Sequence, residues 1–440
     1  MNDPRGNPVS AVSAQALEAS ERALWRMMSF YGTPIDDLDA AIAAEPAWPL
    51  PRLMKAGFLL SLTEPSVVDD ARALVASVPD SGEGSGNARE RAHRAALVRL
   101  SAGDWAAAAD AWSAILREHP RDAPALQWAH LFDFYRGDLA QLAGRVAPLL
   151  AGWPVDDPLH PYVLALHAFG LEESGRYAEA EATGRRALAA DARVPWAIHA
   201  VAHVMEMQGR TREGIDWLQR PRGEWSRNAA FAVHLAWHLA LFRLDNDEPD
   251  AALSIYDRAL VPTKRSSMAA LVDASALLWR LDLHGVRVQR RARQVARHWS
   301  RKRLSGVRAF NLVHATAAFA AARHHRTASQ VIGLLRNDPA TRRVNRPMDL
   351  ALAIPVCEAI AAFARGKYAL AVEKINVVRA LAADCGGSIA QCDLIHLTLL
   401  EAALRSRRMP LAHALATERA ARKPRSLLNR WLFARAATAA

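Results

Sequence analysis

AFGLEESGRYAEAE, the stretch from Ala168 to Glu181, contains the pattern that decides the fold. Gly175 follows an apolar stretch, Tyr177 stands two residues later, and the small Ala180 follows three residues after that. Glycine adopts a left-handed backbone conformation at little cost, so it ends one helix and turns the chain. A small residue in the next helix lets the two helices pack closely. The stretch therefore predicts a helix, a tight turn and a second helix.

The same pattern recurs along the chain, which indicates an internal repeat. Further copies, some of them weaker, begin at Gly103, Gly137, Gly209, Asp247 and Gly366. Gly103 and Gly137 are 34 residues apart, as are Gly175 and Gly209, and this is the period of tetratricopeptide (TPR) repeats. One such unit cannot bury its apolar face alone, so the units stack. The sequence therefore predicts an all-α, TPR-like solenoid or superhelix of helical hairpins.

The composition is that of a folded protein with a sizeable core. Of the 440 residues, 51% are hydrophobic and 23% are charged, which excludes a disordered chain. Residues 81–87 read SGEGSGN, the one clear stretch of flexible-linker composition. We therefore expect an N-terminal helical segment over residues 1–80, a flexible linker over 81–87 and the repeat array over 88–440.

Targeting signals and membrane spans are not evident in the sequence. Residues 1–20 contain no apolar core of the kind found in signal peptides. The longest apolar run, Leu350 to Ala364, is interrupted by a proline and a glutamate and is shorter than a bilayer span. Cys357, Cys385 and Cys392 form no CxxC pair, and their odd number argues against a disulfide framework. We expect a cytoplasmic protein that does not contact a membrane.

The basic residues are concentrated in one stretch. The chain has a net charge of +11, and its densest basic run extends from Arg287 to Arg308. A single-stranded nucleic-acid site would also need aromatic residues for stacking, and this run contains only Trp299. The run therefore predicts a solvated helix face, and nucleic acid is not expected as a partner.

Two histidine pairs stand at helical spacing and one repeat apart. His199 and His203 are four residues apart, as are His234 and His238, so each pair shares one face of a helix. The second pair follows the first after 35 residues. Equivalent helices of adjacent repeats are therefore expected to carry the two pairs side by side, with Glu206 on the same face.

The first helix of each TPR unit lines the concave groove, which defines a set of candidate groove residues. Counting back from Gly175, Gly209 and Asp247 gives a set rich in histidine, glutamate and aromatic residues. The set comprises Tyr162, Phe169, Glu172, Glu173, Trp196, His199, His203, Glu206, His234, Trp237 and His238. The first hypothesis is that this groove binds a peptide, a protein or a small molecule, with Trp196, Trp237, Tyr162 and Phe169 among the contacts.

The second hypothesis is a metal-dependent enzyme, either a hydrolase or an oxidoreductase. Imidazoles four residues apart on a helix can present their nitrogens to one metal ion. The predicted ligands are His199, His203, His234 and His238, which would hold Zn, Fe or Mn. Glu206, Glu172 or Glu173 would act as a further ligand or as the catalytic base. A third hypothesis is a passive scaffold, and the residues alone leave the choice open.

Several longer stretches resemble the tetratricopeptide repeat protein 38 family. They are PLPRLMKAGFLL (49–60), AFGLEESGRYAEAE (168–181), WAIHAVAHVMEMQGR (196–210), HLAWHLALFRL (234–244), DASALLWRL (273–281) and GGSIAQCD (386–393). The resemblance implies a TPR-like α-superhelix. His199, His203, Glu206, His234 and His238 match the family's pattern.

The C-terminal part departs from that family. Where the family usually has GGSHAQRD, this chain has Ile389 and Cys392 in place of a histidine and an arginine. Asn311 and His314 match the family's FNxxH segment, with Leu312 at a position that is usually acidic. If these polar residues belong to a shared site, this chain has lost two of them, and the resemblance implies either a different reaction or a different substrate here. Ser388, three residues before Gln391, also predicts a capping box at the start of a helix.

Overall fold

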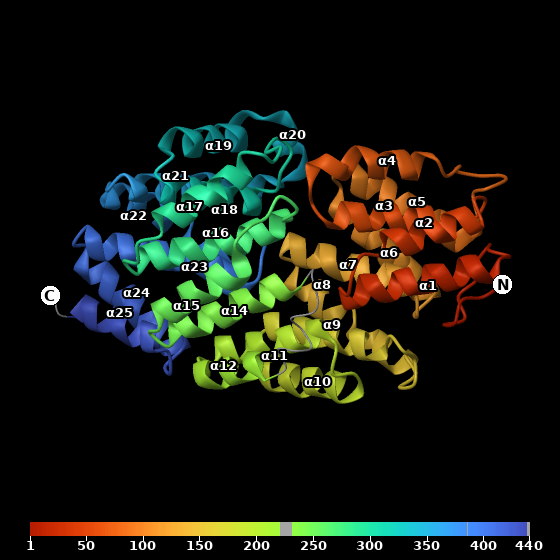
Figure 1. Ribbon diagram of the computed structural model, residues 1–440, viewed down its shortest axis with the longest axis horizontal. Coiled ribbons are helices and arrows are strands. Elements are labelled where there is room, and N and C mark those ends of the chain that lie inside the picture. Colours follow the sequence, from red (N-terminus) through yellow and green to blue (C-terminus); the bar gives the residue numbers. More distant parts are fainter. Residues whose placement is uncertain (221–230, 385, 438–440) are drawn as a thin grey trace. The chain divides into compact units, whose positions relative to one another are not determined.

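The computed structural model describes residues 1–220, 231–384 and 386–437, and most of these residues are helical (Figure 1). Extended pairing within this described part is confined to an isolated bridge between Asn2 and Pro8. The chain forms two compact units. Unit 1 contains Met1–Val201 and Phe231, and unit 2 contains the described residues from Ala202 onward other than Phe231. The all-α prediction is confirmed.

Unit 1 consists of paired helices joined by short turns. They are α1 (Ala14–Ser29), α2 (Ile35–Ala44), α3 (Leu50–Ser61), η1 (Pro65–Val67), α4 (Val68–Ala76), α5 (Ala88–Ser101), α6 (Trp105–Glu118), α7 (Ala123–Arg136), α8 (Leu139–Gly144), η2 (Ala147–Gly152), α9 (His160–Glu173) and α10 (Tyr177–Ala190). Helix α11 (Pro195–Met207) begins in unit 1 and ends in unit 2.

Unit 2 continues the same arrangement. Its helices are α12 (Thr211–Gln219), α14 (Ala232–Asp245), α15 (Pro249–Ile255), η3 (Tyr256–Leu260), α16 (Met268–Leu283), α17 (Gln289–Trp299), α18 (Ala309–Ala321), α19 (His325–Asn337), α20 (Pro339–Val344), α21 (Pro347–Ala364), α22 (Tyr368–Asn376), η4 (Arg379–Asp384), α23 (Ile389–Arg405), α24 (Met409–Arg422) and α25 (Leu427–Ala437).

A residue in the left-handed conformation marks the turn inside the hairpins, two positions before the second helix begins. These residues are Gly103, Gly137, Gly175, Gly209, Asp247, Arg323, Gly366 and Arg407, with φ between 58° and 93°. The turns predicted at the glycines and at Asp247 are confirmed. Arg323 and Arg407 take the same role, which a glycine-based pattern does not detect.

In most hairpins the first helix is far more buried than the second, although α5 and α6 differ little. In unit 2, 12 of the 13 residues of α18 are buried, but only Ala328, Val331 and Leu335 of α19 are. In unit 1, α9 and α10 show the same contrast. First helices therefore form the interior of each unit, and second helices cover them with one apolar face.

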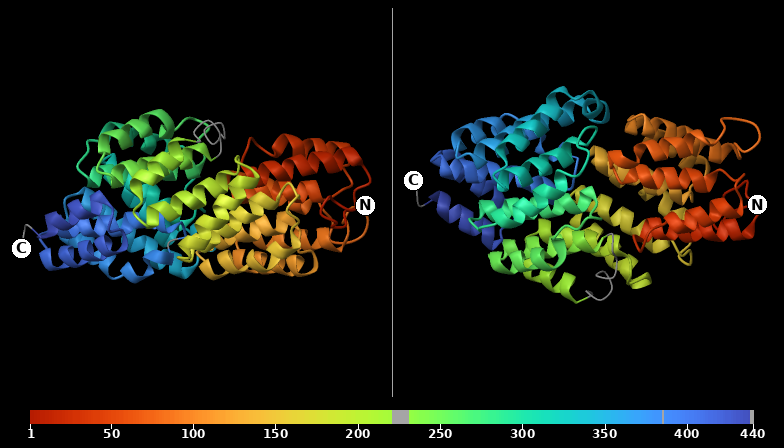
Figure 2. Two further views of the ribbon diagram at one scale, coloured as in Figure 1. Left: turned by 90° about the horizontal axis from the view of Figure 1, so that it is seen from below. Right: turned by 45° about the horizontal axis from the view of Figure 1, so that its top comes forward.

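Unit 2 brings its last helices beside its first ones. In Figures 1 and 2 the blue helices α23 to α25 lie beside the green helices α14 and α16. The Trp279 indole donates to Oγ1 of Thr398 at 2.9 Å, and Ser426 donates to Oδ1 of Asp245 at 2.8 Å. These two bonds join the C-terminal helices to α16 and α14.

The predicted linker over residues 81–87 is a turn within unit 1. Asn87 caps α5 in a reciprocal capping box with Glu90. The same Glu90 accepts a hydrogen bond of 2.7 Å from the Trp48 indole, and Gly86 packs so closely on Pro49 that an added Cβ would lie 2.7 Å from it. This packing joins residues 1–80 to the helices that follow, and the division between units falls in α11 instead.

Helix α21 and the cysteines bear on the expectations about membrane contact and disulfides. Within the described residues, α21 is the one helix long and apolar enough to cross a membrane, and 56% of it is buried, as in core helices generally. Cys357 on α21 is a buried free thiol. Cys392 is disulfide-bonded, which the odd cysteine count did not anticipate, and Cys385 lies outside the described residues.

The Arg-rich stretch forms the one-sided helix α17. Arg290, Arg293 and Arg297 are exposed, whereas Val295 and Trp299 are buried against the rest of unit 2. The Trp299 indole donates to Oγ of a buried serine of α16 at 2.9 Å. The basic side of the helix is thus solvated, as predicted, and the aromatic residue belongs to the core.

Candidate metal centre

Three imidazoles converge inside unit 2. His203 comes from the end of α11, and His234 and His238 lie one turn apart on α14. Each offers a ring nitrogen, and these nitrogens lie within 4.8 Å of one another. The ring of His238 lies 4.6 Å from that of His203 and 4.8 Å from that of His234, measured between centroids. The predicted pairing of histidines from neighbouring first helices is therefore present for these three residues.

Two carboxylates fix the orientation of the α14 imidazoles. Nδ1 of His234 lies 3.0 Å from Oδ2 of Asp273 on α16, and Nδ1 of His238 lies 3.0 Å from Oε2 of Glu206 on α11. An ionised carboxylate only accepts hydrogen bonds, so each Nδ1 carries the proton and donates it. In a neutral ring the lone pair is then on Nε2.

The ionisation states of Glu206 and His238 follow from their surroundings. Burial and the nearby His203 lower the pKa of His238 to about 3, despite its hydrogen bond to Glu206. Burial opposes ionisation of Glu206, but Lys423 and the hydrogen bond from His238 outweigh it and lower the pKa of Glu206 to about 2. At neutral pH the site therefore contains a carboxylate and a neutral imidazole, the form in which histidine binds metals.

The two Nε2 atoms of His234 and His238 face each other at 3.3 Å. A direct hydrogen bond between them would require one ring to carry two protons or one carboxylate to be protonated. Two nitrogens bound about 2.05 Å from a tetrahedral ion lie about 3.3 Å apart. The spacing and the tautomers are therefore those of two ligands of one metal ion.

The surroundings of the centre are tightly packed. The Trp237 ring stacks on His234 with a centroid distance of 5.4 Å and an interplanar angle of 14°, and Arg280 lies 5.5 Å above the same indole. His203 and His238 are fully buried, whereas 20% of the His234 side chain is exposed. His234 is therefore the one of these three imidazoles that solvent reaches.

The other predicted site residues lie in unit 1 and are buried there. They are Tyr162, Phe169, Glu172, Glu173, Trp196 and His199, each at most 8% exposed. Trp196 packs on Phe169 with centroids 4.9 Å apart, as aromatic core residues do. His199 precedes His203 by one turn of α11. Trp237, predicted as a groove contact in unit 2, is fully buried.

Two residues of the centre were not found from the sequence. Asp273 follows His234 by 39 residues on the next first helix, which is four to five residues more than the repeat spacing, so the repeat count does not point to it. Lys423, whose Nζ lies 3.7 Å from Oε1 of Glu206, carries no signal in the repeat pattern.

No family model matches the chain. Among solved structures, a human IFIT1 dimer described with m7Gppp-AAAA is 12% identical, with 98% of this chain and 91% of that chain covered and a TM-score of 0.42. A monomeric IFIT1 mutant, also described with m7Gppp-AAAA, is 13% identical over 84% of this chain and 77% of that chain, with a TM-score of 0.40. A tetratricopeptide repeat protein from Parabacteroides merdae is 12% identical over 71% and 98%, with a TM-score of 0.31.

These likenesses concern architecture and assign no ligand to this chain. The expectation that nucleic acid is not a partner therefore stays a prediction. The repeated hairpins, their 34-residue spacing and their left-handed turn residues make this chain an all-α, TPR-like helical repeat protein.

Proposed function

We propose that the protein binds a divalent transition metal, Zn²⁺ in the first instance, through His203, His234 and His238. The observation that carries the proposal is the 3.3 Å approach of two Nε2 atoms whose rings are each oriented by a carboxylate on Nδ1. Carboxylate–histidine–metal arrangements of this kind set the tautomer and raise the basicity of the ligand. All-nitrogen donors suit Zn²⁺ and also Fe²⁺.

The number of ligands decides between two roles for the metal. Three histidines leave one position of a four-coordinate ion for water or substrate, which is the arrangement of catalytic zinc sites. A fourth protein ligand would close the site and make it structural. We propose the three-ligand form and a hydrolytic reaction, since His234 gives solvent a route to the ion.

An open peptide groove has less support. Its predicted aromatic contacts Trp196, Phe169 and Trp237 are at most 8% exposed and pack on neighbouring rings. We also propose that the chain belongs to the tetratricopeptide repeat protein 38 family, because its histidine pairs match the pattern of that family. A metal centre is then expected in related chains as well.

The test is the metal content of the purified protein and its affinity for Zn²⁺ in competition with a chromophoric chelator. We expect about one zinc per chain and a loss of affinity of more than about 100-fold in His203→Ala and His238→Ala. His413→Ala, an exposed histidine of α24, is the matched control and keeps wild-type affinity. A wild-type protein that takes up no metal, or a His238→Ala variant that binds as tightly as wild type, would refute the proposal.

Cobalt substitution separates the two roles. In the three-ligand form, the visible spectrum of the Co²⁺ protein changes on addition of azide or thiocyanate, which enter the open position. A spectrum that is insensitive to anions would assign the ion a structural role.

A further inference from the structure

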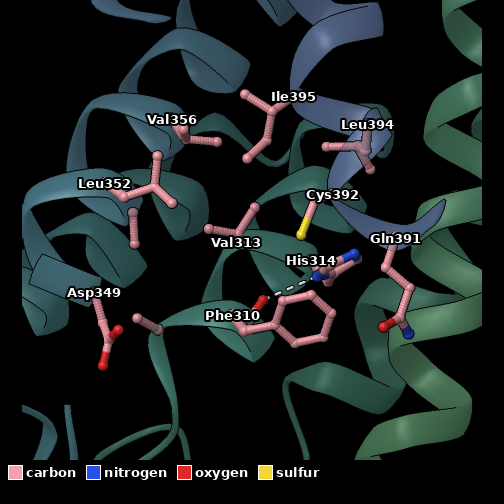
Figure 3. A pocket seen from close by; sticks show the side chains of 12 residues that line it. Phe310, Val313, His314, Asp349, Leu352, Val356, Gln391, Cys392, Leu394 and Ile395 are labelled. Atoms are coloured by element: carbon pink, nitrogen blue, oxygen red, sulfur yellow. Dashed lines mark hydrogen bonds between the residues drawn. The ribbon is translucent and has the colours of Figure 1, made fainter. Parts of the chain in front are cut away.

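The cavity between α18, α21 and α23 in unit 2 is too small for an organic ligand (Figure 3). It holds about 20 Å³, which is room for about one water molecule. Its lining includes His314 and Gln391, and Gln391 also closes the predicted capping box with Ser388 at the start of α23. A partner larger than water must therefore bind to the outside of this part of unit 2.

The positive charge of the chain is concentrated in its second half. Residues 202–440 contain 38 lysines and arginines and 19 aspartates and glutamates, whereas residues 1–201 contain 18 and 26. Between Asp282 and Asp338 the chain has 12 basic residues and no acidic one. This stretch includes the outer helices α17 and α19, so its own sequence supplies no carboxylate to balance them.

Helix α17 (Figure 1) presents three arginines to solvent along one line. Arg290, Arg293 and Arg297 are exposed, and their spacing of three and four residues places them on one side of the helix. The opposite side packs on unit 2 through Val295 and Trp299. At a rise of 1.5 Å per residue, the three arginines extend over about 10 Å. We call them the arginine row.

Within the part of the chain that the structure describes, no carboxylate forms an ion pair with the arginine row. The adjacent Arg291 is paired, since its guanidinium donates to both carboxylate oxygens of Asp257 at 2.7 and 2.6 Å. Burial and neighbouring cations, Arg301 first among them, lower the pKa of His298 on the same helix, as expected where positive charges gather. The row is therefore a concentrated and unbalanced positive charge.

The spacing of the row indicates the shape of a fitting anion. A second α-helix repeats its side chains at the same intervals of three and four residues, so carboxylates on one of its faces can meet each arginine in turn. Side chains on one face of a strand are about 6.8 Å apart, and they drift out of register with the row by about 3 Å over its length. A single-stranded nucleic acid would also need exposed aromatic residues, and Trp299 is buried.

We propose that the arginine row of α17 docks an acidic α-helix of another protein, with glutamates or aspartates repeated at three- and four-residue intervals on one face. A guanidinium is suited to this role because it stays charged and binds a carboxylate with two parallel hydrogen bonds, as Arg291 does with Asp257. This contact is independent of the proposed metal centre, whose ligands belong to α11 and α14.

The test compares two labelled, alanine-based helical peptides of identical composition by fluorescence anisotropy. The aligned peptide has its glutamates at the spacing of the arginine row, and the scattered peptide has the same glutamates distributed around the helix. We expect the aligned peptide to bind about tenfold more tightly, because each exposed ion pair contributes about two- to threefold. Arg290→Gln, Arg293→Gln and Arg297→Gln, combined in one variant, should remove this preference.

The matched control removes the same charge elsewhere in unit 2. Arg212, Arg422 and Arg430 are also exposed, so a variant that combines Arg212→Gln, Arg422→Gln and Arg430→Gln should fold and keep the preference for the aligned peptide. The proposal is overturned if the wild-type protein binds neither peptide or binds both equally, or if the control variant loses the preference as well.

Two further outcomes would assign the arginine row to a different partner and overturn the proposal. The first is an RNA duplex that displaces the aligned peptide at equal concentration. The second is a salt-sensitive dimer of the wild-type chain in analytical ultracentrifugation that the variant without the row does not form.

Discussion

Nζ of Lys423 lies 3.7 Å from Oε1 of Glu206, and Oε2 of the same glutamate accepts a 3.0 Å hydrogen bond from His238. The glutamate therefore lies between a cation from the end of α24 and an imidazole on α14. The ammonium keeps the carboxylate ionised, and the carboxylate keeps the proton of His238 on Nδ1. The C-terminal part of unit 2 thus acts on the proposed metal ligand through one intermediate residue.

Removing the carboxylates that bond Nδ1 of His234 and His238 should weaken metal binding without abolishing it. Glu206→Gln and Asp273→Asn are expected to lower the affinity for Zn²⁺ by about 10- to 100-fold, because each leaves an imidazole that is less basic and less firmly oriented. Lys423→Met should have a smaller effect in the same direction. Chelator competition measures all three. The control is Lys374→Met, which removes a cation paired with Glu358 elsewhere in unit 2 and should leave the affinity for Zn²⁺ unchanged. If this variant lost as much affinity as Lys423→Met, the effect would come from the net charge and not from the contact with Glu206.

Replacing either of two helical glycines of unit 2 by alanine should change the stability of the unit, but in opposite directions. A Cβ on Gly214 in α12 would lie 2.2 Å from the Phe242 ring, so Gly214→Ala is expected to destabilise unit 2 by about 1–3 kcal/mol. Gly333 in α19 has nothing within 4 Å of that position, so Gly333→Ala should stabilise it by up to about 1 kcal/mol. Urea unfolding gives both values. A Gly214→Ala variant as stable as wild type would show that the helix contact is looser than described.

Acidification should destabilise unit 1 through His130. Burial lowers the pKa of His130 to about 3, while the unfolded chain titrates near 6.5. Protons therefore bind the unfolded state first as the pH falls, and the stabilising contribution, complete above pH 6.5, is lost between pH 6.5 and 3.

The matched variant for this effect is His130→Gln, which keeps an N–H for the Leu166 carbonyl that His130 contacts at 3.0 Å. Between pH 7 and pH 5 the wild-type free energy of unfolding should fall by about 2 kcal/mol more than that of the variant. Denaturant unfolding at the two pH values measures the difference. Equal losses in both proteins would mean that His130 is protonated in the folded state.

Two aspartates that cap helices of unit 1 should differ in how much they contribute to its stability. Asp122 caps α7 and also accepts hydrogen bonds from Arg89 at 2.7 Å and His93 at 3.0 Å, all fully buried. Asp122→Ala leaves a buried guanidinium uncompensated and should cost about 3–5 kcal/mol. Asp104 only caps the exposed start of α6, and Asp104→Ala should cost about 1 kcal/mol. Thermal unfolding followed by circular dichroism should separate the two variants, and similar costs would contradict the role of the buried pair.

The fold could be predicted from the sequence to the level of its hairpins. Gly175 and Gly209 reveal their turns because glycine is the residue that adopts a positive φ most readily, and the repeat spacing located the helices on either side. The turns at Arg323 and Arg407 have the same backbone but no glycine, so tertiary packing, which the sequence does not display, determines them.

The sequence predicted only those residues of the candidate site that occupy equivalent positions in neighbouring repeats. His203 and His238 are equivalent positions of neighbouring repeats, so the period alone brings them together. Lys423 reaches Glu206 because α24 returns to the start of unit 2, which depends on the curvature accumulated over the intervening hairpins. Trp196 and Phe169 were placed in an open groove, but their burial in unit 1 follows from packing that the pattern does not specify.

The bond between Ser426 and Asp245 joins residues that are 181 positions apart, and this separation matters while the chain is being made. At synthesis rates of roughly 5–20 residues per second, Asp245 leaves the ribosome roughly 10 to 40 seconds before its partner exists. Lys423, the counterion of Glu206, is equally late. Until then the sides of α14 and α16 that contact α25 and α23 lack those neighbours, so the packing of unit 2 is completed only when its last helices have been made.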